Sequence, residues 1–227
     1  MRFEDFNWMD VENYLKTDDR LMLITGACEQ HGYLSLLTDS KIPLALASAA
    51  SQQTGVLVGP ALNFGISPYF AAYPGTISLR AQTYLAVIGD MVRSLHGSGF
   101  RRLLFVNGHG GNDPARGVLA ELVNELPGLQ VSWYSWWLAP STAAVAQDAG
   151  LSQHHASWSE AFSFCRVAEL PAGDKPAASS PRLLNAQETR ALYGDGVFGG
   201  PYSAGEAVMQ RLFDGCVADV VGRLRFA

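Results

Sequence analysis

Short, continuous runs of apolar residues alternate along the chain with longer segments in which apolar side chains recur every three or four positions. The short runs indicate strands, because each has the length of a buried strand and is bounded by polar residues or glycine. They cover residues 21–26, 56–59, 102–107 and 129–136. Strands that are apolar on both faces are typical of a parallel sheet that is covered on both sides.

The longer segments predict helices, which cover residues 41–53, 79–95, 114–126 and 205–224. Strands that alternate with helices predict an α/β fold with a mainly parallel central sheet. No internal repeat or linker interrupts this alternation, so we expect a single domain over residues 1–227. Proline, alanine and serine predict a loop at residues 171–182 within that domain.

The amino-acid composition argues against some classes of binding partner. Charged residues make up 16% of the chain, below the ~25% that is usual for soluble domains, which is compatible with contacts between subunits. The net charge is -5, and no basic stripe of the kind found in nucleic-acid-binding proteins is visible. No segment has the ~20 apolar residues of a membrane helix. We therefore expect neither nucleic acid nor a membrane as partner.

Three tryptophans, Trp133, Trp136 and Trp137, lie close together in the sequence. We expect at least one of them to line a pocket or a subunit contact.

Cysteine usage and the N-terminal residues indicate the compartment. Cys28, Cys165 and Cys216 are widely spaced, which argues against a disulfide framework. The first ten residues are polar and acidic, without the apolar core of a signal peptide. We therefore expect a cytoplasmic protein.

Side chains that can carry chemistry gather where the predicted strands end. Glu29, His31 and, after a turn, Asp39 follow the first strand, and His109 follows the third. Such strand ends are where open α/β sheets place their sites. Carboxylates with imidazoles suit zinc, manganese or iron(II) better than calcium or copper(I). Taken alone, the Glu29–His31 pair also fits a surface salt bridge, and the glycines around His109 fit a sharp turn.

A third group follows the fourth strand and a helical stretch. It contains His154, His155 and Glu160. We expect Glu160 to open a helix over the apolar residues 161–167, with its carboxylate favoured by the helix dipole. The histidine pair by itself fits a simple loop equally well.

Taken in order, the motifs resemble the creatininase family from about residue 21 to the C-terminus. They are Glu-Gln-His-Gly at 29–32, Thr-Asp at 38–39, Tyr-Pro-Gly-Thr-Ile-Ser at 73–78, Asn-Gly-His-Gly-Gly-Asn at 107–112 and His-Ala-x-x-x-Glu at 155–160. The resemblance implies a three-layer α/β/α sandwich, a hydrolytic site with two divalent transition metals (Zn, Mn or Fe) per chain, and often a homohexamer.

The resemblance also implies a ligand set. Glu29, Asp39 and His109 match the ligands of one metal, and His31 with the same aspartate, as a bridge, matches the second. Glu160 lies in the family's His-Ala-x-x-x-Glu motif and is the expected further ligand.

The sequence departs from the family pattern at three places. The segment between Glu29 and Asp39 is one residue shorter than usual. Gly110 and Gly111 replace a Tyr-Glu pair whose glutamate is a ligand in true creatininases, which argues against creatinine as the substrate. Trp158 stands where many relatives have a further glutamate.

We interpret the chain as a metal-dependent amidohydrolase acting on a small-molecule substrate, a cyclic or formyl-type amide, with a metal-activated water. His155 and Glu160 are the candidate catalytic residues, with His155 transferring a proton to the leaving nitrogen. Two alternatives stay open: a peptidase-like member acting on a modified-peptide precursor, and a catalytically inactive binding or scaffold member.

Overall fold

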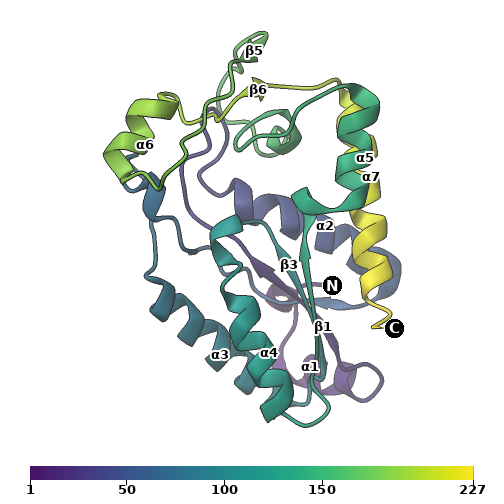
Figure 1. Cartoon of the computed structure of the whole chain (residues 1–227). Coiled ribbons are helices and arrows are strands. Elements are labelled where there is room, and N and C mark those ends of the chain that lie inside the picture. The colour runs from purple at the N-terminus through teal and green to yellow at the C-terminus, as the bar shows by residue number, and fades with distance from the viewer. Residues whose placement is uncertain (227) are drawn as a thin grey trace.

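The computed structural model describes residues 1–226 and contains a central parallel sheet (Figure 1). The sheet has four strands in the order β2-β1-β3-β4, and neighbouring strands pair in parallel. The strands are β1 (Arg20–Thr25), β2 (Leu57–Val58), β3 (Arg102–Asn107) and β4 (Gln130–Ser135). The parallel sheet predicted from continuous apolar runs is thereby confirmed.

Helices cover both faces of this sheet. Helices α2 (Thr38–Thr54), α5 (Pro140–Ala149) and α7 (Glu206–Arg223) pack on one face, and α3 (Ala81–Ser98) and α4 (Ala115–Glu125) pack on the other. Figure 1 shows α5 lying along α7 and α4 along α3. This arrangement is the α/β/α sandwich that the resemblance implies.

Alternate residues of the strands supply the two cores. Met22 and Ile24 of β1 belong to the cluster under α2 and α7, whereas Leu21 and Leu23 belong to the cluster under α3 and α4. Burying each such side chain contributes about 1.5–3 kcal/mol. The sheet is therefore held from both sides, which fixes the direction in which its strand ends point.

Sequence patterns missed two short helices. These are α1 (Trp8–Leu15) and α6 (Ala186–Tyr193), each eight residues long. Each begins with a capping box, in which an asparagine caps the helix and an acidic residue three positions later returns the hydrogen bond. They were missed because their apolar periodicity is short, although the capping signal was present.

A short antiparallel pair, β5 (Asp174–Lys175) with β6 (Gly200–Pro201), lies within and after the predicted loop. Together with α6 it gathers at one end of the molecule, opposite α1 (Figure 1). Among residues 1–226, no helix combines the length and hydropathy that a membrane span needs.

Candidate metal centre

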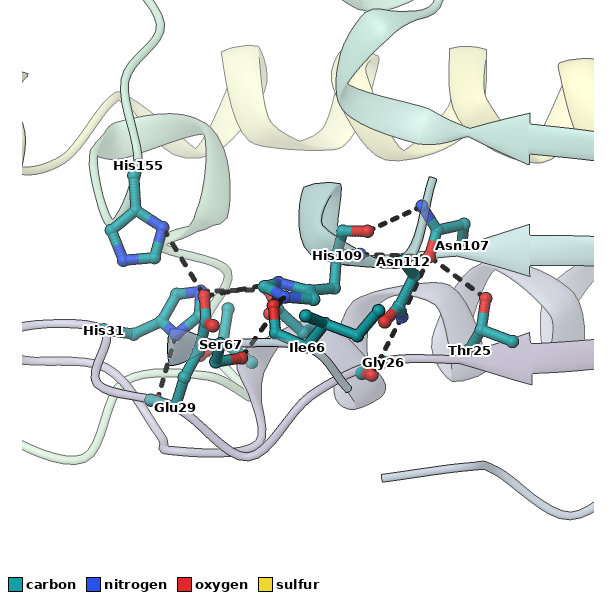
Figure 2. A network of polar contacts seen from close by, with 12 residues as sticks. Thr25, Gly26, Glu29, His31, Ile66, Ser67, Asn107, His109, Asn112 and His155 are labelled. Atoms are coloured by element: carbon teal, nitrogen blue, oxygen red, sulfur yellow. Dashed lines mark hydrogen bonds and ion pairs between the residues drawn. The ribbon is translucent and has the colours of Figure 1, made fainter. Parts of the chain in front are cut away.

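Buried acidic and imidazole side chains meet beyond the carboxyl ends of β1 and β3. We call Glu29, His31, Asp39, His109 and Glu160 the carboxylate–histidine cluster. The first two follow β1, His109 follows β3, and Asp39 lies in the first turn of α2. Figure 2 shows Glu29, His31 and His109 facing a common region. The structure thus brings together all five residues that the resemblance assigns to metal binding.

Asp39 lies between two histidines. Its Oδ1 is 3.0 Å from Nε2 of His31, and its Oδ2 is 2.9 Å from Nδ1 of His109. Gly108 makes this position accessible, because a Cβ there would lie 1.9 Å from the Asp39 carbonyl oxygen. The first turn of α2 therefore packs directly on the backbone after β3. The shortened segment after Glu29 still brings Asp39 into the cluster.

Backbone groups orient both imidazoles. Nε2 of His109 lies 2.9 Å from the carbonyl oxygen of Ile66 and 3.2 Å from Oγ of Ser67. Nδ1 of His31 lies 3.2 Å from the carbonyl oxygen of Glu29. A proton on each of these nitrogens leaves the other nitrogen free to face the carboxylates, which is how ligating histidines are commonly fixed.

Two asparagines of the Asn-Gly-His-Gly-Gly-Asn motif tie the loop in place. Asn107 Nδ2 donates to the carbonyl oxygen of His109 at 2.9 Å. Asn112 Nδ2 donates to the carbonyl oxygen of Gly26 at 3.1 Å. The first bond holds the loop after β3 together, and the second connects this loop to the end of β1 (Figure 2). The ligand set expected from the sequence does not include these asparagines, although their place on either side of His109 is a signal of their role.

Glu160, the fifth residue of the cluster, follows neither β1 nor β3 but lies in a 3-10 turn. Its Oε2 is 3.9 Å from Nε2 of His31 and accepts a hydrogen bond from the backbone N–H of Ala156 at 2.5 Å. Ala156 has φ 59, a left-handed conformation that is strained for any residue other than glycine. The strain aims this N–H at the carboxylate.

The predicted helix over residues 161–167 is wrong. Glu160 ends a 3-10 turn over Trp158–Glu160, and the following residues pair with the loop after His31 instead. The backbone N–H of Ser35 donates to the Cys165 carbonyl oxygen at 2.7 Å. Tertiary pairing outweighs the local apolar pattern here, so the Ala156 N–H, and not a helix dipole, supports the carboxylate.

The atoms of the cluster fit divalent metal ions. One group of possible ligand atoms comes from Glu29, Asp39 and His109, and a second comes from His31, Asp39 and Glu160. We call these the His109 group and the Glu160 group; within each, the atoms lie within 4.8 Å of one another. Oε2 of Glu29 is buried without a hydrogen-bond partner, and Nε2 of His31 and Oδ2 of Asp39 are buried with other members of the cluster as their polar neighbours. Buried polar atoms of this kind are costly unless something satisfies them, and a metal ion is the partner that suits all three.

The electrostatics favour cations in the same place. Burial lowers the pKa of His31, but Asp39, Glu160 and Glu29 outweigh burial and raise it to about 10. Burial also lowers the pKa of His109. The contacts with Glu29 and Asp39 outweigh burial and raise this pKa well above its usual value. Burial raises the pKa of Glu160 to about 7. The crowded carboxylates therefore create a negative potential that attracts positive charge.

Gly111 explains why the family's additional glutamate is missing. A Cβ at this position would lie 2.0 Å from the carbonyl oxygen of Ile66 and 2.4 Å from Nε2 of His109. No side chain fits there without moving the backbone that orients His109. In this chain Glu160 is the acidic residue that forms one possible ligand group with both His31 and Asp39. Trp158, at the other departure, is fully buried and donates from Nε1 to the Ser152 carbonyl oxygen at 2.9 Å.

His155 also faces the cluster (Figure 2). Its Nδ1 is 3.9 Å from Oε1 of Glu29, and its ring centroid is 4.4 Å from that of His31. Burial, followed by the charge of His31, lowers the pKa of His155 to about 3. At neutral pH the imidazole of His155 is therefore uncharged in the metal-free protein.

A cavity of about 710 Å³ leads from the cluster to the surface. Glu29, Asp39, His109 and Glu160 lie among its lining residues, as does Trp137. We expected at least one of Trp133, Trp136 and Trp137 to line a pocket or a subunit contact. Trp137 lines this cavity, whereas Trp136 is buried in the core. The outer lining includes apolar residues that are largely exposed, among them Leu138 (68%) and Leu183 (87%).

Two known proteins are similar to this chain in sequence. The chain is 29% identical over 223 residues to the mycofactocin precursor peptide peptidase of Mycobacterium ulcerans (strain Agy99), covering 90% of this chain and 84% of the relative. It is 33% identical to creatinine amidohydrolase of Pseudomonas putida, over 112 residues that make up 46% of this chain and 43% of that protein. This second match therefore spans less than half the length of the relative.

Solved creatininases have the same fold. A mutant creatininase of the Zn–Zn type superposes with a TM-score of 0.85 at 23% identity, covering 99% of this chain and 96% of that chain. A structure named creatininase Mn has a TM-score of 0.84 at 22% identity, covering 99% and 97%. The family model described as creatinine amidohydrolase matches residues 4–224. The chain therefore belongs to the creatininase family of metal-dependent hydrolases.

Proposed function

We propose that this protein is a metal-dependent hydrolase that cleaves an amide bond of a peptide substrate. This is the second of the interpretations that the sequence left open, and it replaces the small cyclic or formyl-type amide as the preferred one. The observation that carries it is the carboxylate–histidine cluster at the base of a broad cavity.

The size and lining of the cavity support a substrate larger than a small cyclic amide. Its volume of about 710 Å³ is in the range of sites that enclose drug-sized ligands, about 300–1,000 Å³. The exposed side chains of Leu138 and Leu183, which belong to the cavity lining, offer apolar contacts to a substrate. The relatives matched along most of their length are peptide peptidases, which supports the same substrate class.

The ligand assignments belong to this proposal. The His109 group would hold one divalent metal ion and the Glu160 group a second, with Asp39 shared between them. Bound metal ions would supply Lewis acidity for the amide carbonyl and a lowered pKa for bound water. Asp39, whose two carboxylate oxygens face His31 and His109, would be the ligand that both ions have in common.

Proton transfer falls to His155. Its Nδ1 faces the cluster, from which it can accept a proton and return it to the leaving nitrogen. Burial raises the pKa of Glu160 to about 7 in the metal-free protein, whereas as a metal ligand the same carboxylate would be deprotonated. Backbone N–H groups of Gly110 and Gly111, which line the cavity, are candidates for stabilising the developing oxyanion.

The test is a hydrolysis assay on protein reconstituted with zinc, manganese or iron(II). Peptides of varied length and small cyclic and formyl amides are incubated with the protein, and mass spectrometry detects the new carboxyl and amino products. Asp39→Asn serves as the inactive control, and Asp90→Asn, at an exposed position on α3, as the matched active one.

We expect cleavage of peptides that depends on metal and on Asp39. Cleavage of small amides with no cleavage of peptides would restore the first interpretation. Tight metal binding without hydrolysis of either class would favour the inactive binding member.

We also propose self-association, and the resemblance points to a hexamer. Support comes from apolar side chains that stay exposed in the single chain, such as Trp8 (70%) and Val167 (66%). Light scattering at micromolar concentration tests the proposal, and a purely monomeric mass would contradict it.

A further inference from the structure

Gln30 stands between two of the proposed ligands in the sequence, yet its side chain serves another purpose. Nε2 of Gln30 donates to the Gly196 carbonyl oxygen at 3.0 Å and lies 2.9 Å from Nε2 of His155. Its Oε1 accepts from the backbone N–H of Gly32 at 3.1 Å. The residue is buried, and each polar atom of its carboxamide has a partner. None of the roles assigned above involves this side chain.

The partners determine which way the carboxamide points. Oε1 must face Gly32, since a backbone N–H can only donate. Nε2 must face Gly196, since a carbonyl oxygen can only accept. A reversed amide would lose both bonds, so the group that meets His155 is a donor in a fixed position.

His155 is held on several sides. Its ring stacks on Phe70, with centroids 4.8 Å apart and planes inclined by 19°, and lies 4.9 Å from the ring of Phe198. The Gln30 backbone oxygen also lies 3.1 Å from Nε2 of His155. The aromatic rings limit tilting, and Gln30 limits rotation by holding the Nε2 edge. Nδ1 is thereby kept toward the carboxylate–histidine cluster.

Gln30 offers Nε2 of His155 two kinds of partner. The side-chain N–H can donate to Nε2 when that nitrogen carries no proton, and the backbone oxygen can accept when it does. The ring therefore keeps a hydrogen bond at this edge in either tautomer. Such a partner suits a histidine whose other nitrogen exchanges a proton with the reacting groups.

The loop after α6 is built around the same side chain. Gly196 has φ +94, and a Cβ there would lie 1.7 Å from Oε1 of Gln30. The ends of this loop carry Tyr193 and Phe198, which both line the cavity. Gln30 therefore links the cavity wall to His155.

We propose that Gln30 is a positioning residue of the hydrolytic site, which fixes the His155 ring with Nδ1 toward the cluster and joins it to the loop after α6. The inference rests on the proposed role of His155 in proton transfer. Gln30 is not itself among the residues that line the cavity or among the possible metal ligands.

Two variants test it. Gln30→Met keeps the length of the side chain and removes all of its hydrogen bonds. Gln30→Glu keeps an acceptor for Gly32 but replaces the donor that faces His155 and Gly196, so it tests the donor even if Gln30→Met fails to fold. Gln53→Met, at an exposed position on α2, is the matched control.

The first measurement separates kcat from KM on zinc-loaded protein, normalised to bound metal. We expect kcat to fall by ~100-fold in both variants, as for a catalytic group displaced by about 1 Å, with metal content and KM close to wild type. A purely structural role would instead lower the yield or metal content and leave kcat per loaded site unchanged, which would overturn the proposal.

The second measurement needs no substrate. Ring nitrogen spectra of ¹⁵N-histidine protein contain 5 histidines, and His155→Gln identifies the resonances of His155. We expect the balance between Nδ1–H and Nε2–H tautomers of His155 to change in Gln30→Met and to stay unchanged in Gln53→Met. An unchanged His155 tautomer in Gln30→Met overturns the positioning role. If the wild type hydrolyses nothing, the proposed function fails while this readout still decides the role of Gln30.

Discussion

The His109 group and the Glu160 group share Asp39 but are built differently. In the His109 group, Nδ1 of His109 lies 2.9 Å from Asp39 and 3.4 Å from Glu29. In the Glu160 group, the carboxylate stays 3.9 Å from His31. His109 of the first group lies in a loop after β3 that asparagine side chains hold in place, whereas Glu160 of the second group is placed by a 3-10 turn.

The difference shows how supporting structure sets the precision of a site. Side chains on rigid elements are held more closely than side chains on loops. The Glu160 group is instead supported by the strained N–H of Ala156. We therefore expect the His109 group to bind its metal more tightly and the Glu160 group to be the one that exchanges.

The largest effect is expected from removing the shared residue. Asp39→Ala should reduce metal content from about two ions per chain to nearly none and lower hydrolysis by on the order of 10³-fold, because Lewis-acid stabilisation is worth several kcal/mol. Elemental analysis and the hydrolysis assay measure both, with Asp90→Ala as control. If Asp39→Ala keeps the wild-type metal content, the bridge between the two groups does not exist.

The next two substitutions each remove one proposed ligand from a single group. Glu160→Gln should leave about one metal ion per chain, held by the His109 group, and Glu29→Gln should release the other ion instead. Competition with a chelator followed by elemental analysis distinguishes them. Unchanged occupancy and activity in Glu160→Gln would make Glu160 structural and leave one firm metal site.

Protons and metal ions should compete for the cluster. The pKa of His31 is raised to about 10 and that of His109 well above 6.5. Both rings are therefore protonated on both nitrogens, and positively charged, at pH 7 in metal-free protein. Loading both groups should therefore release about two protons. Calorimetry in buffers of different ionisation enthalpy counts them, and binding without proton release at pH 7 would contradict the raised pKa values.

The same shifts give the sign of a stability effect. A histidine whose folded pKa is raised stabilises the metal-free protein fully below the unfolded value of about 6.5 and loses that contribution as the pH rises through about 10. Metal-free protein should thus lose stability across this window, and metal-loaded protein should not. Thermal melts from pH 6 to 10 compare the two forms.

The smallest effect concerns the support of the Glu160 group. Ala156→Gly removes left-handed strain of about 1 kcal/mol, which offsets the entropy that glycine loses on folding. We expect unchanged or slightly higher stability, together with weaker retention of the Glu160-group metal. Ala120→Gly, at an exposed position within α4, should instead cost about 0.5–1 kcal/mol. Equal destabilisation by both changes would show that Ala156 carries no strain.

The sequence alone determined the sheet and the place of the site. The apolar runs at residues 21–26 and 102–107 lie within one residue of β1 and β3, because strands that are buried on both faces are nearly continuously apolar. Polar residues directly after such strands can only reach the shared edge of a parallel sheet. Glu29, His31 and His109 were therefore predictable as neighbours.

Tertiary structure decided what the remaining segments do. Residues 161–167 have the apolar character of a helix, yet they pair with the loop after His31, because hydrogen bonds to a distant segment are invisible to local periodicity. Gln30 reads as part of a ligand motif, but its bonds to His155 and Gly196 join residues more than a hundred positions away. Only the folded packing brings such groups within reach, and that packing makes Gln30 a neighbour of His155.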